Sequence, residues 1–79
     1  MTQTEYFKHR VLNGRPYIRL AWCEATVRDP ETVHVQPDGR IRHWRFIPEL
    51  GKHLRVVTLS DGETLHNAFP DRSFTPPAP

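Results

Sequence analysis

Four short β-prone segments, joined by connections of only a few residues, occupy the chain between Thr32 and Phe69. In order, the segments are 32–36, 40–47, 53–59 and 64–69. Parallel strands need a crossover of a dozen or more residues, so consecutive segments joined this closely should pair antiparallel. The last connection contains Asp61-Gly62, which is typical of a two-residue hairpin turn. The sequence therefore predicts a four-stranded antiparallel meander.

Two helices are expected before this meander. The first would span 5–12, with Thr4 as its cap and Asn13-Gly14 as its end, although an extended strand would use the same apolar residues nearly as well. The second would begin at 17 or 18 and end at 28, because its apolar residues form one stripe on a helix and no face on a strand. The stripe consists of Ile18, Trp22, Cys23, Thr26 and Val27.

The second helix should lie across one face of the sheet and bury Trp22, the largest apolar side chain of the first half. Neither face of the strands is uniformly apolar, so we expect a partner or ligand to cover part of the other face. The predicted fold class is therefore α+β, with one or two N-terminal helices packed on a four-stranded antiparallel β-meander.

A chain of 79 residues has room for one domain with a thin core. We expect this domain to span 5–74, with a disordered N-terminus at 1–4 and a disordered proline-rich tail at 75–79. The sequence has no run of about 18 apolar residues that could span a membrane, and its N-terminus does not resemble a signal peptide. These features predict a cytoplasmic protein that does not bind a membrane.

The formal net charge is only +2, but the lysines and arginines are unevenly distributed. Between positions 40 and 55, five of them are accompanied by a single acid, Glu49. The middle of the meander should therefore carry a positive field that attracts a polyanion such as RNA. The residues expected to bind RNA are Arg40, Arg42, Arg45, Lys52 and Asn67.

A metal site and a cofactor site are both unexpected. A zinc site needs about four converging ligands, yet the chain has a single cysteine, Cys23, which we expect to serve in packing. No two histidines have the H-x3–5-H spacing of a zinc site: they are His9, His34, His43, His53 and His66. The glycines lie where turns require them, so no phosphate-binding loop is expected.

The imidazole and guanidinium groups of the sheet suit metal-free cleavage of RNA. That reaction needs a group to take the 2′-hydroxyl proton, a cation to stabilise the phosphate and an acid to protonate the 5′-oxygen. Histidine titrates near neutral pH, and arginine binds phosphate through a fork of donors. The candidate catalytic residues, from adjacent strands and the segment after them, are His53, Arg55, His66 and Arg72. Alternatively, these charged and polar groups only keep the sheet soluble and discourage pairing at its edges.

Six stretches carry a resemblance to a known family: Arg15–Ile18, Trp22-Cys23, Asp29–Glu31, Gln36–Ile41, Gly51–Thr64 and His66–Arg72. Through them, the chain from about residue 5 to 74 resembles small bacterial domains of unknown function that are distantly similar to BrnT and RelE-type toxins. Those toxins are metal-independent ribonucleases neutralised by a cognate antitoxin. The resemblance implies helices followed by an antiparallel sheet, RNA as the substrate and an antitoxin as a partner. It also implies a site among Lys52, His53, Arg55, His66 and Arg72.

These observations lead to the hypothesis of a metal-independent endoribonuclease toxin. In this hypothesis, His53 or His66 moves protons while Arg55 and Arg72 bind the phosphate. Two alternatives stay open. One is a non-catalytic protein-interaction module, for which a homodimer is one option, and the other is a nucleic-acid-binding domain without catalysis.

Overall fold

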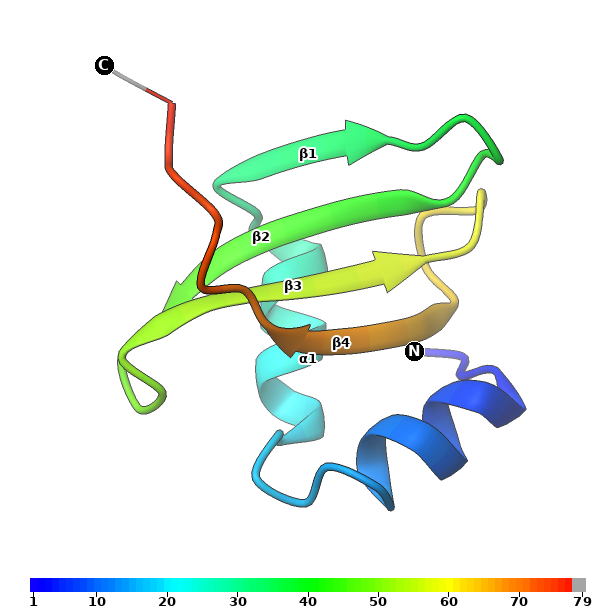
Figure 1. Ribbon diagram of the computed structural model, residues 1–79. Helices are drawn as coiled ribbons and strands as arrows, with labels where there is room; N and C mark the ends of the chain where they lie inside the picture. The colour runs from blue at the N-terminus through cyan, green and yellow to red at the C-terminus, as the bar shows by residue number, and fades with distance from the viewer. Residues whose placement is uncertain (78–79) are drawn as a thin grey trace.

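The computed structural model describes residues 1–77, and its sheet is the expected meander (Figure 1). The strands lie in the order β1-β2-β3-β4, and each neighbouring pair is antiparallel. The α+β fold class is therefore confirmed. The elements are η1 (Phe7–Leu12), α1 (Leu20–Arg28), β1 (Thr32–Val35), β2 (Ile41–Ile47), β3 (Lys52–Thr58) and β4 (Leu65–Pro70).

The connection between β3 and β4 is wider than the predicted two-residue turn. Leu59 donates its N–H to the carbonyl oxygen of Thr64 at 3.0 Å, so four residues form the loop. Only Gly62 takes the left-handed conformation there, with φ +72°, whereas a two-residue turn of the expected type needs positive φ at both positions. The Asp61 carboxylate instead accepts the N–H groups of Glu63 and Thr64, both at 2.9 Å, and thereby holds the loop.

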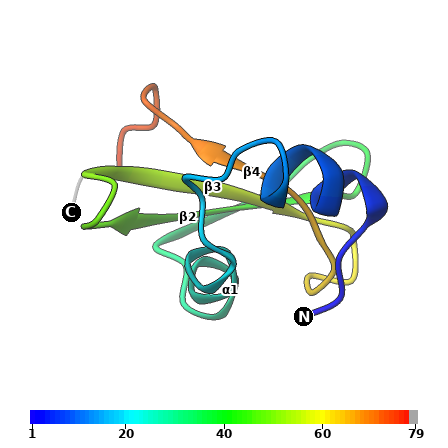
Figure 2. The same cartoon turned by 90° about the horizontal axis from the view of Figure 1, so that it is seen from below.

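The helix α1 covers one face of the sheet, as expected, and the C-terminal segment that follows β4 lies on the other side (Figure 2). On the covered face, Ile47 of β2 is buried, and Leu54 and Val56 of β3 are fully buried. The core combines this face with side chains from both helices, from the connection between them and from β4: Phe7, Val11, Ile18, Cys23, Ile47, Leu54, Val56, Leu65 and Ala68. Burial of these apolar side chains is the main stabilising contribution in a fold of this size.

The inward-facing residues of α1 are Cys23 and Thr26 rather than Trp22. Trp22 is half-buried at the margin of the core, so the expectation of a buried Trp22 is wrong. The helix also begins at Leu20, later than predicted, because Arg19 is still extended with φ −92° and ψ 139°. Burial raises the pKa of the Cys23 thiol to about 12, so the thiol stays protonated and acts as a packing group.

The first helix forms where it was predicted, but its main part, η1, is a π-helix. Asn13 donates its N–H to the carbonyl oxygen of Lys8, five residues earlier, at 3.2 Å. Phe7 and Val11 are fully buried and pack η1 against β4. Thr4 caps the helix as expected, because its Oγ1 accepts the N–H of Phe7 at 3.1 Å.

The residues before this helix are ordered by the sheet, which corrects the expectation of a frayed N-terminus at 1–4. Gln3 forms a parallel bridge with Leu65 of β4. Leu65 donates to the carbonyl oxygen of Thr2 at 2.8 Å, and Thr4 donates to that of Leu65 at 2.9 Å. The N-terminal segment thus covers the outer edge of β4 at its start.

The C-terminal residues 75–77 are exposed and belong to no helix or strand, and the rest of the predicted tail lies outside the described residues. Neither η1 nor α1, the helices of the described range 1–77, has the length and apolar character needed to cross a membrane.

Candidate functional site

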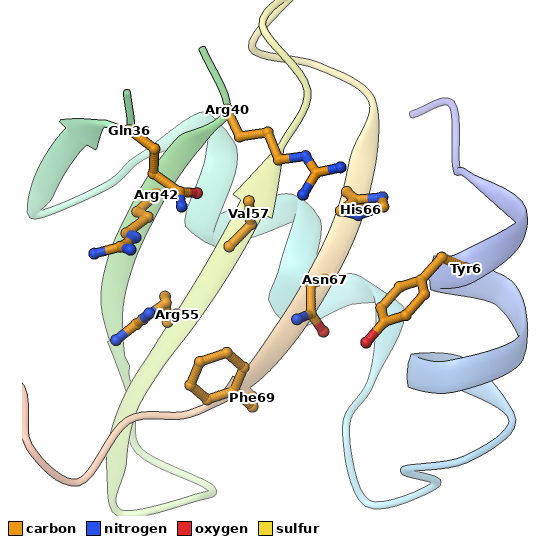
Figure 3. A pocket seen from close by; sticks show the side chains of 9 residues that line it. All are labelled: Tyr6, Gln36, Arg40, Arg42, Arg55, Val57, His66, Asn67 and Phe69. Atoms are coloured by element: carbon orange, nitrogen blue, oxygen red, sulfur yellow. The ribbon is translucent and has the colours of Figure 1, made fainter. Parts of the chain in front are cut away.

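The face of the sheet opposite α1 carries most of the residues that could bind a ligand. Alternation along the strands places Arg42 and Trp44 of β2, Arg55 of β3, and Asn67 and Phe69 of β4 on this face. A cavity of about 310 Å³ lies over it (Figure 3). Its lining consists of Tyr6, Gln36, Arg40, Arg42, Arg55, Val57, His66, Asn67 and Phe69.

The cavity brings together five residues that the sequence singled out: Arg40, Arg42, Arg55, His66 and Asn67. They come from β2, β3, β4 and the residue just before β2, and Tyr6 reaches the cavity from the N-terminal helix. Three guanidinium groups and one imidazole therefore share one concave surface, and no carboxylate side chain among residues 1–77 lines it. Such a surface suits an anion that carries several oxygen acceptors, as a phosphodiester does.

Arg42 is the cation of this group that lacks a partner. Its Nε is buried and makes no hydrogen bond in the part of the chain that is described. Within residues 1–77, no carboxylate forms an ion pair with it. By contrast, Arg40 lies 3.8 Å from the carboxylate of Asp38, and Arg55 is paired with Asp71. A buried donor without a partner costs about 1–3 kcal/mol, so Arg42 is the least satisfied cation of this group.

A register irregularity of the sheet places His66 at the cavity. Thr58 pairs with Leu65 whereas Val57 pairs with Asn67, so one extra residue of β4, His66, lies between two successive pairs. Leu65 points into the core, and the ring of His66 stacks on Tyr6 with centroids 5.0 Å apart. Its Nδ1 lies 3.0 Å from Thr4 Oγ1.

The electrostatic surroundings of His66 favour its neutral form. Partial burial lowers the pKa of His66 first, and the nearby charge of Arg40 lowers it further, against a smaller opposing effect of Asp38. The ring is therefore mostly neutral at pH 7. In the tautomer in which Nδ1–H donates to Thr4 Oγ1, Nε2 carries the lone pair that a general base needs.

Asn67 is oriented by Arg15, a residue that the sequence did not single out. Its Oδ1 accepts a hydrogen bond from the Arg15 guanidinium at 3.0 Å and one from the Ala68 N–H at 2.9 Å. Arg15 also donates to the carbonyl oxygen of Ala68 at 2.9 Å. Because Oδ1 is occupied, the amide NH₂ of Asn67 is left to donate to a ligand in the cavity.

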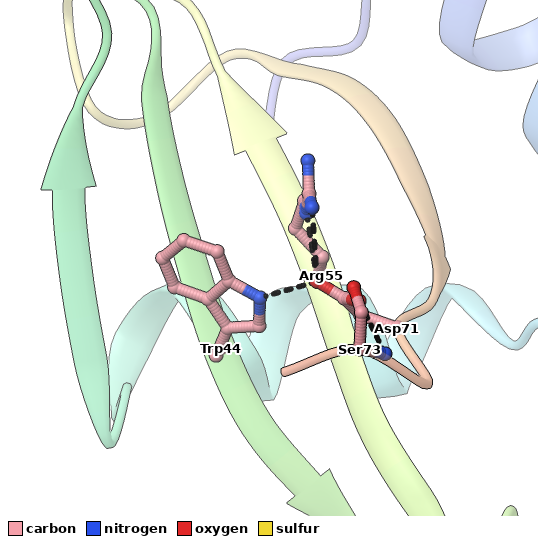
Figure 4. A network of polar contacts seen from close by, with 4 residues as sticks. All are labelled: Trp44, Arg55, Asp71 and Ser73. Carbon is pink, nitrogen blue, oxygen red and sulfur yellow. Dashed lines mark hydrogen bonds and ion pairs between the residues drawn. The ribbon is translucent and has the colours of Figure 1, made fainter. Parts of the chain in front are cut away.

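Asp71 organises the other end of the cavity (Figure 4). Its Oδ2 accepts hydrogen bonds from Trp44 Nε1 at 3.0 Å and from Arg55 Nε and Nη2 at 3.1 and 3.0 Å. Its Oδ1 accepts from the N–H and Oγ of Ser73 at 3.1 and 2.8 Å. Burial alone would raise the pKa of Asp71, but the hydrogen bonds from Trp44, Ser73 and Arg55 outweigh it and hold this pKa well below its usual range.

This network fixes Arg55 and partly neutralises its charge. The guanidinium carbon also lies 4.8 Å from the ring centroid of Phe69 and 5.5 Å from that of Trp44. The sequence pattern did not indicate Asp71 and favoured its neighbour Arg72. Alternation of side chains continued past the end of β4 places Asp71 on the same face as Asn67 and Phe69. This pattern is the signal that could have identified Asp71.

His53 and Arg72 do not join the cavity, so the expected convergence of four catalytic residues needs correction. His53 shares the open face, but its Nε2 lies 3.1 Å from Glu31 Oε1 and its ring packs against Phe46 and Phe74. Arg72 is exposed in the segment after β4. The turn at Asp71 directs the chain back over Trp44, where Phe74 stacks at 5.0 Å, and leaves Arg72 outside the cavity.

Arg45 and Lys52 also lie outside the cavity, on the face that α1 covers. Arg45 alternates with Arg42 and Trp44 along β2, and Lys52 pairs with the buried Ile47. The guanidinium of Arg45 donates to the backbone oxygen and carboxylate of Asp29 at 2.8 and 2.9 Å, at the end of α1. Neither residue can contact a ligand bound on the open face.

Within residues 1–77, no group of three histidine, cysteine or acidic side chains lies close enough to hold a metal ion. The chain matches no family model, no curated protein and no solved structure. The function is therefore inferred from the geometry of the open face.

Proposed function

We propose that the protein is a metal-independent endoribonuclease of the cytoplasm, with the phosphate backbone of single-stranded RNA bound in the cavity on the open face. The observation that carries this proposal is the half-buried guanidinium of Arg42, which has no carboxylate partner in the described chain. Arg40 and the amide of Asn67 add donors beside it, and Phe69 and Tyr6 offer rings on which bases can stack. The resemblance to BrnT and RelE-type toxins adds an antitoxin as the expected protein partner.

The reaction would use the substrate's own 2′-hydroxyl as the nucleophile. His66 Nε2 takes the 2′-hydroxyl proton, and the 2′-oxygen attacks phosphorus. The bond from phosphorus to the 5′-oxygen then breaks, while Arg42 stabilises the charge on the phosphate. The leaving 5′-oxygen takes its proton from the Tyr6 hydroxyl. The products are a 2′,3′-cyclic phosphate and a 5′-hydroxyl, and the imidazolium and phenolate return to neutral through water.

Cleavage of RNA in the presence of a chelator tests this proposal. His66→Asn removes the base, and we expect it to lower the cleavage rate by about 100-fold or more, the usual contribution of a general base. Tyr6→Phe keeps the ring stacked on His66 and removes only the hydroxyl, so it should slow cleavage without weakening RNA binding. His9→Asn is the matched control, because His9 is exposed on η1 and does not line the cavity.

Each variant is purified by the same procedure as the wild type, so that a contaminating nuclease would cleave RNA equally in all preparations. Wild-type protein that leaves cyclic phosphate ends, with His66→Asn inactive and folded, supports the assignment. If His66→Asn cleaves at the wild-type rate, the assignment of the base is wrong.

A second candidate function is binding of RNA without cleavage. It is favoured by one observation: of the two imidazoles considered for catalysis, only His66 lines the cavity. Wild-type protein that binds single-stranded RNA but leaves it intact would support this function over the nuclease. Failure to bind RNA at low salt would contradict both.

A further inference from the structure

The two edges of the sheet differ in how they are protected. The edge of β4 is bridged by the N-terminal residues through Gln3 and is flanked by η1. The strand β1 pairs only with β2 in the described structure, so its outer edge is open. Val33 is 50% exposed and Val35 is 60% exposed along this edge. An open edge with exposed apolar side chains is a ready template for another strand.

The hydrogen bonding of β1 determines which backbone groups are free. Gln36 donates its N–H to the carbonyl oxygen of Arg40 at 2.7 Å, so Gln36 points its backbone groups toward β2. Backbone direction alternates along an antiparallel strand, and His34 and Thr32 therefore also point toward β2. The N–H and C=O groups of Val33 and Val35 point away from the sheet, where they can bond a new strand.

The order of side chains in β1 indicates which strand would fit. Thr32-Val33-His34-Val35-Gln36 has the same chemical pattern in both directions: polar, valine, histidine, valine, polar. If a second copy of this strand pairs antiparallel so that the two His34 residues lie opposite each other, Val33 of each chain lies opposite Val35 of the other. These two pairs are the ones whose backbone groups point outward, so the side-chain pattern and the hydrogen-bond pattern agree on one register.

The strand also lacks the features that normally prevent such pairing. Natural edge strands carry proline, or lysine and other charged residues, that discourage addition of a strand. From Thr32 to Val35 there is no lysine, arginine, acid or proline. Antiparallel pairing of two copies is isologous, so it closes as a dimer and does not propagate into a fibre.

We propose that two copies of this chain associate through β1 and form one continuous eight-stranded antiparallel sheet. The four valines of the two strands pack together on the side of the sheet that carries α1. The two His34 side chains face each other on the open side, beside Arg42, which is the partner of His34 within each copy. Gln36, which lines the cavity, lies next to this junction, so the two cavities share one continuous face.

The oligomeric state in solution tests the interface. Sedimentation equilibrium of the wild-type protein should give twice the 9.3 kDa chain mass. Val35→Lys places a charge on the new valine pair and should halve the measured mass. Because Val35 is exposed, circular dichroism and the Tm of this variant should remain those of a folded chain. Tyr17→Lys is the matched control: Tyr17 is 56% exposed but lies before α1, so this variant should remain dimeric.

The register is tested by disulfide cross-linking. His34→Cys should form a disulfide-linked dimer in air, because residues directly opposite in a pair without backbone hydrogen bonds have close Cβ atoms. Val33→Cys should not, because the two introduced thiols are offset along the strands. Cys23 is buried and does not interfere. A monomeric wild type, a dimeric Val35→Lys, or cross-linking of Val33→Cys in place of His34→Cys would each overturn the proposal.

Discussion

At the scale of single residues, Arg42 and Asp71 have opposite situations on the same face. The Nε of Arg42 is buried without a partner in the described part of the chain, whereas Asp71 accepts hydrogen bonds from three side chains. An unpaired buried group lowers stability and is retained where it has a function, while a fully satisfied one holds the structure together. The two residues should therefore respond to mutation in opposite ways.

Replacing Arg42 by Gln should weaken RNA binding without destabilising the fold. The variant removes an unpaired cation, so the free energy of unfolding should stay the same or rise by up to about 1 kcal/mol. RNA affinity should fall, and the slope of its logarithm against the logarithm of salt concentration should decrease by about one. Urea unfolding and a salt titration of binding measure both quantities. Arg28→Gln, on the exposed surface of α1, should leave binding unchanged. Wild-type affinity in Arg42→Gln would contradict the binding site.

Replacing Asp71 by Asn should destabilise the protein by about 2–4 kcal/mol, because Arg55 loses its buried counter-charge. The pKa of Asp71 lies below its ordinary value of 3.8, so its contribution is present above that pH and is lost as pH falls below it. Thermal unfolding between pH 7 and pH 2 should therefore have a shallower acid dependence in Asp71→Asn than in the wild type. Glu49→Gln, which changes an exposed acid, serves as the control. Equal acid slopes in Asp71→Asn and wild type would contradict this role.

At the scale of elements, the layer between α1 and the sheet contains a titratable group. His43 of β2 is only 5% exposed on the covered face, and its Nδ1 lies 3.1 Å from the carbonyl oxygen of Val56. Burial lowers the pKa of His43, while its backbone hydrogen bonds oppose this effect to a smaller extent. Protonating this ring requires a charge between the two layers, so the helix and sheet pack best when it is neutral.

Stability should therefore fall as the pH is lowered through the range in which His43 titrates. Its folded pKa lies below the ordinary value of 6.5, so the unfolded chain binds more protons from about that pH downward. We expect His43→Gln to flatten the dependence of the unfolding free energy on pH between 7 and 5, as measured by urea unfolding. His66 contributes in the same direction, so the variant should reduce the slope without abolishing it. An unchanged slope in His43→Gln would show that His43 protonates without a cost in stability.

The elements also differ in how far the sequence predicts them. Short connections dictate the antiparallel order of the strands, and the alternation of β2 places Arg42 and Arg45 on opposite faces. The π-helical form of η1 has no comparable signal, because its backbone pattern depends on fitting Phe7 and Val11 against β4. For the same reason, the stripe on α1 predicted a helix but not which residue of the stripe would face the sheet.

At the scale of the whole molecule, contacts between distant parts of the chain create the candidate site. Thr4 binds His66, Arg15 binds Asn67, and Asp71 binds Arg55. Each of these contacts orients a cavity residue, and the first two span more than fifty positions of sequence. Local patterns carry no information about such pairs, which explains why the predicted site included Arg72 and omitted Tyr6.

Taken alone, the sequence determined the class of fold, the order of the strands and the alternation of residues along them. These depend on connection length and on the two-residue period of a strand, which are local properties of the chain. The tertiary structure decided which face α1 covers, which cations remain unpaired and which histidine reaches the cavity. Those outcomes depend on how remote segments pack, because packing selects which side chains lose water and which acquire a partner.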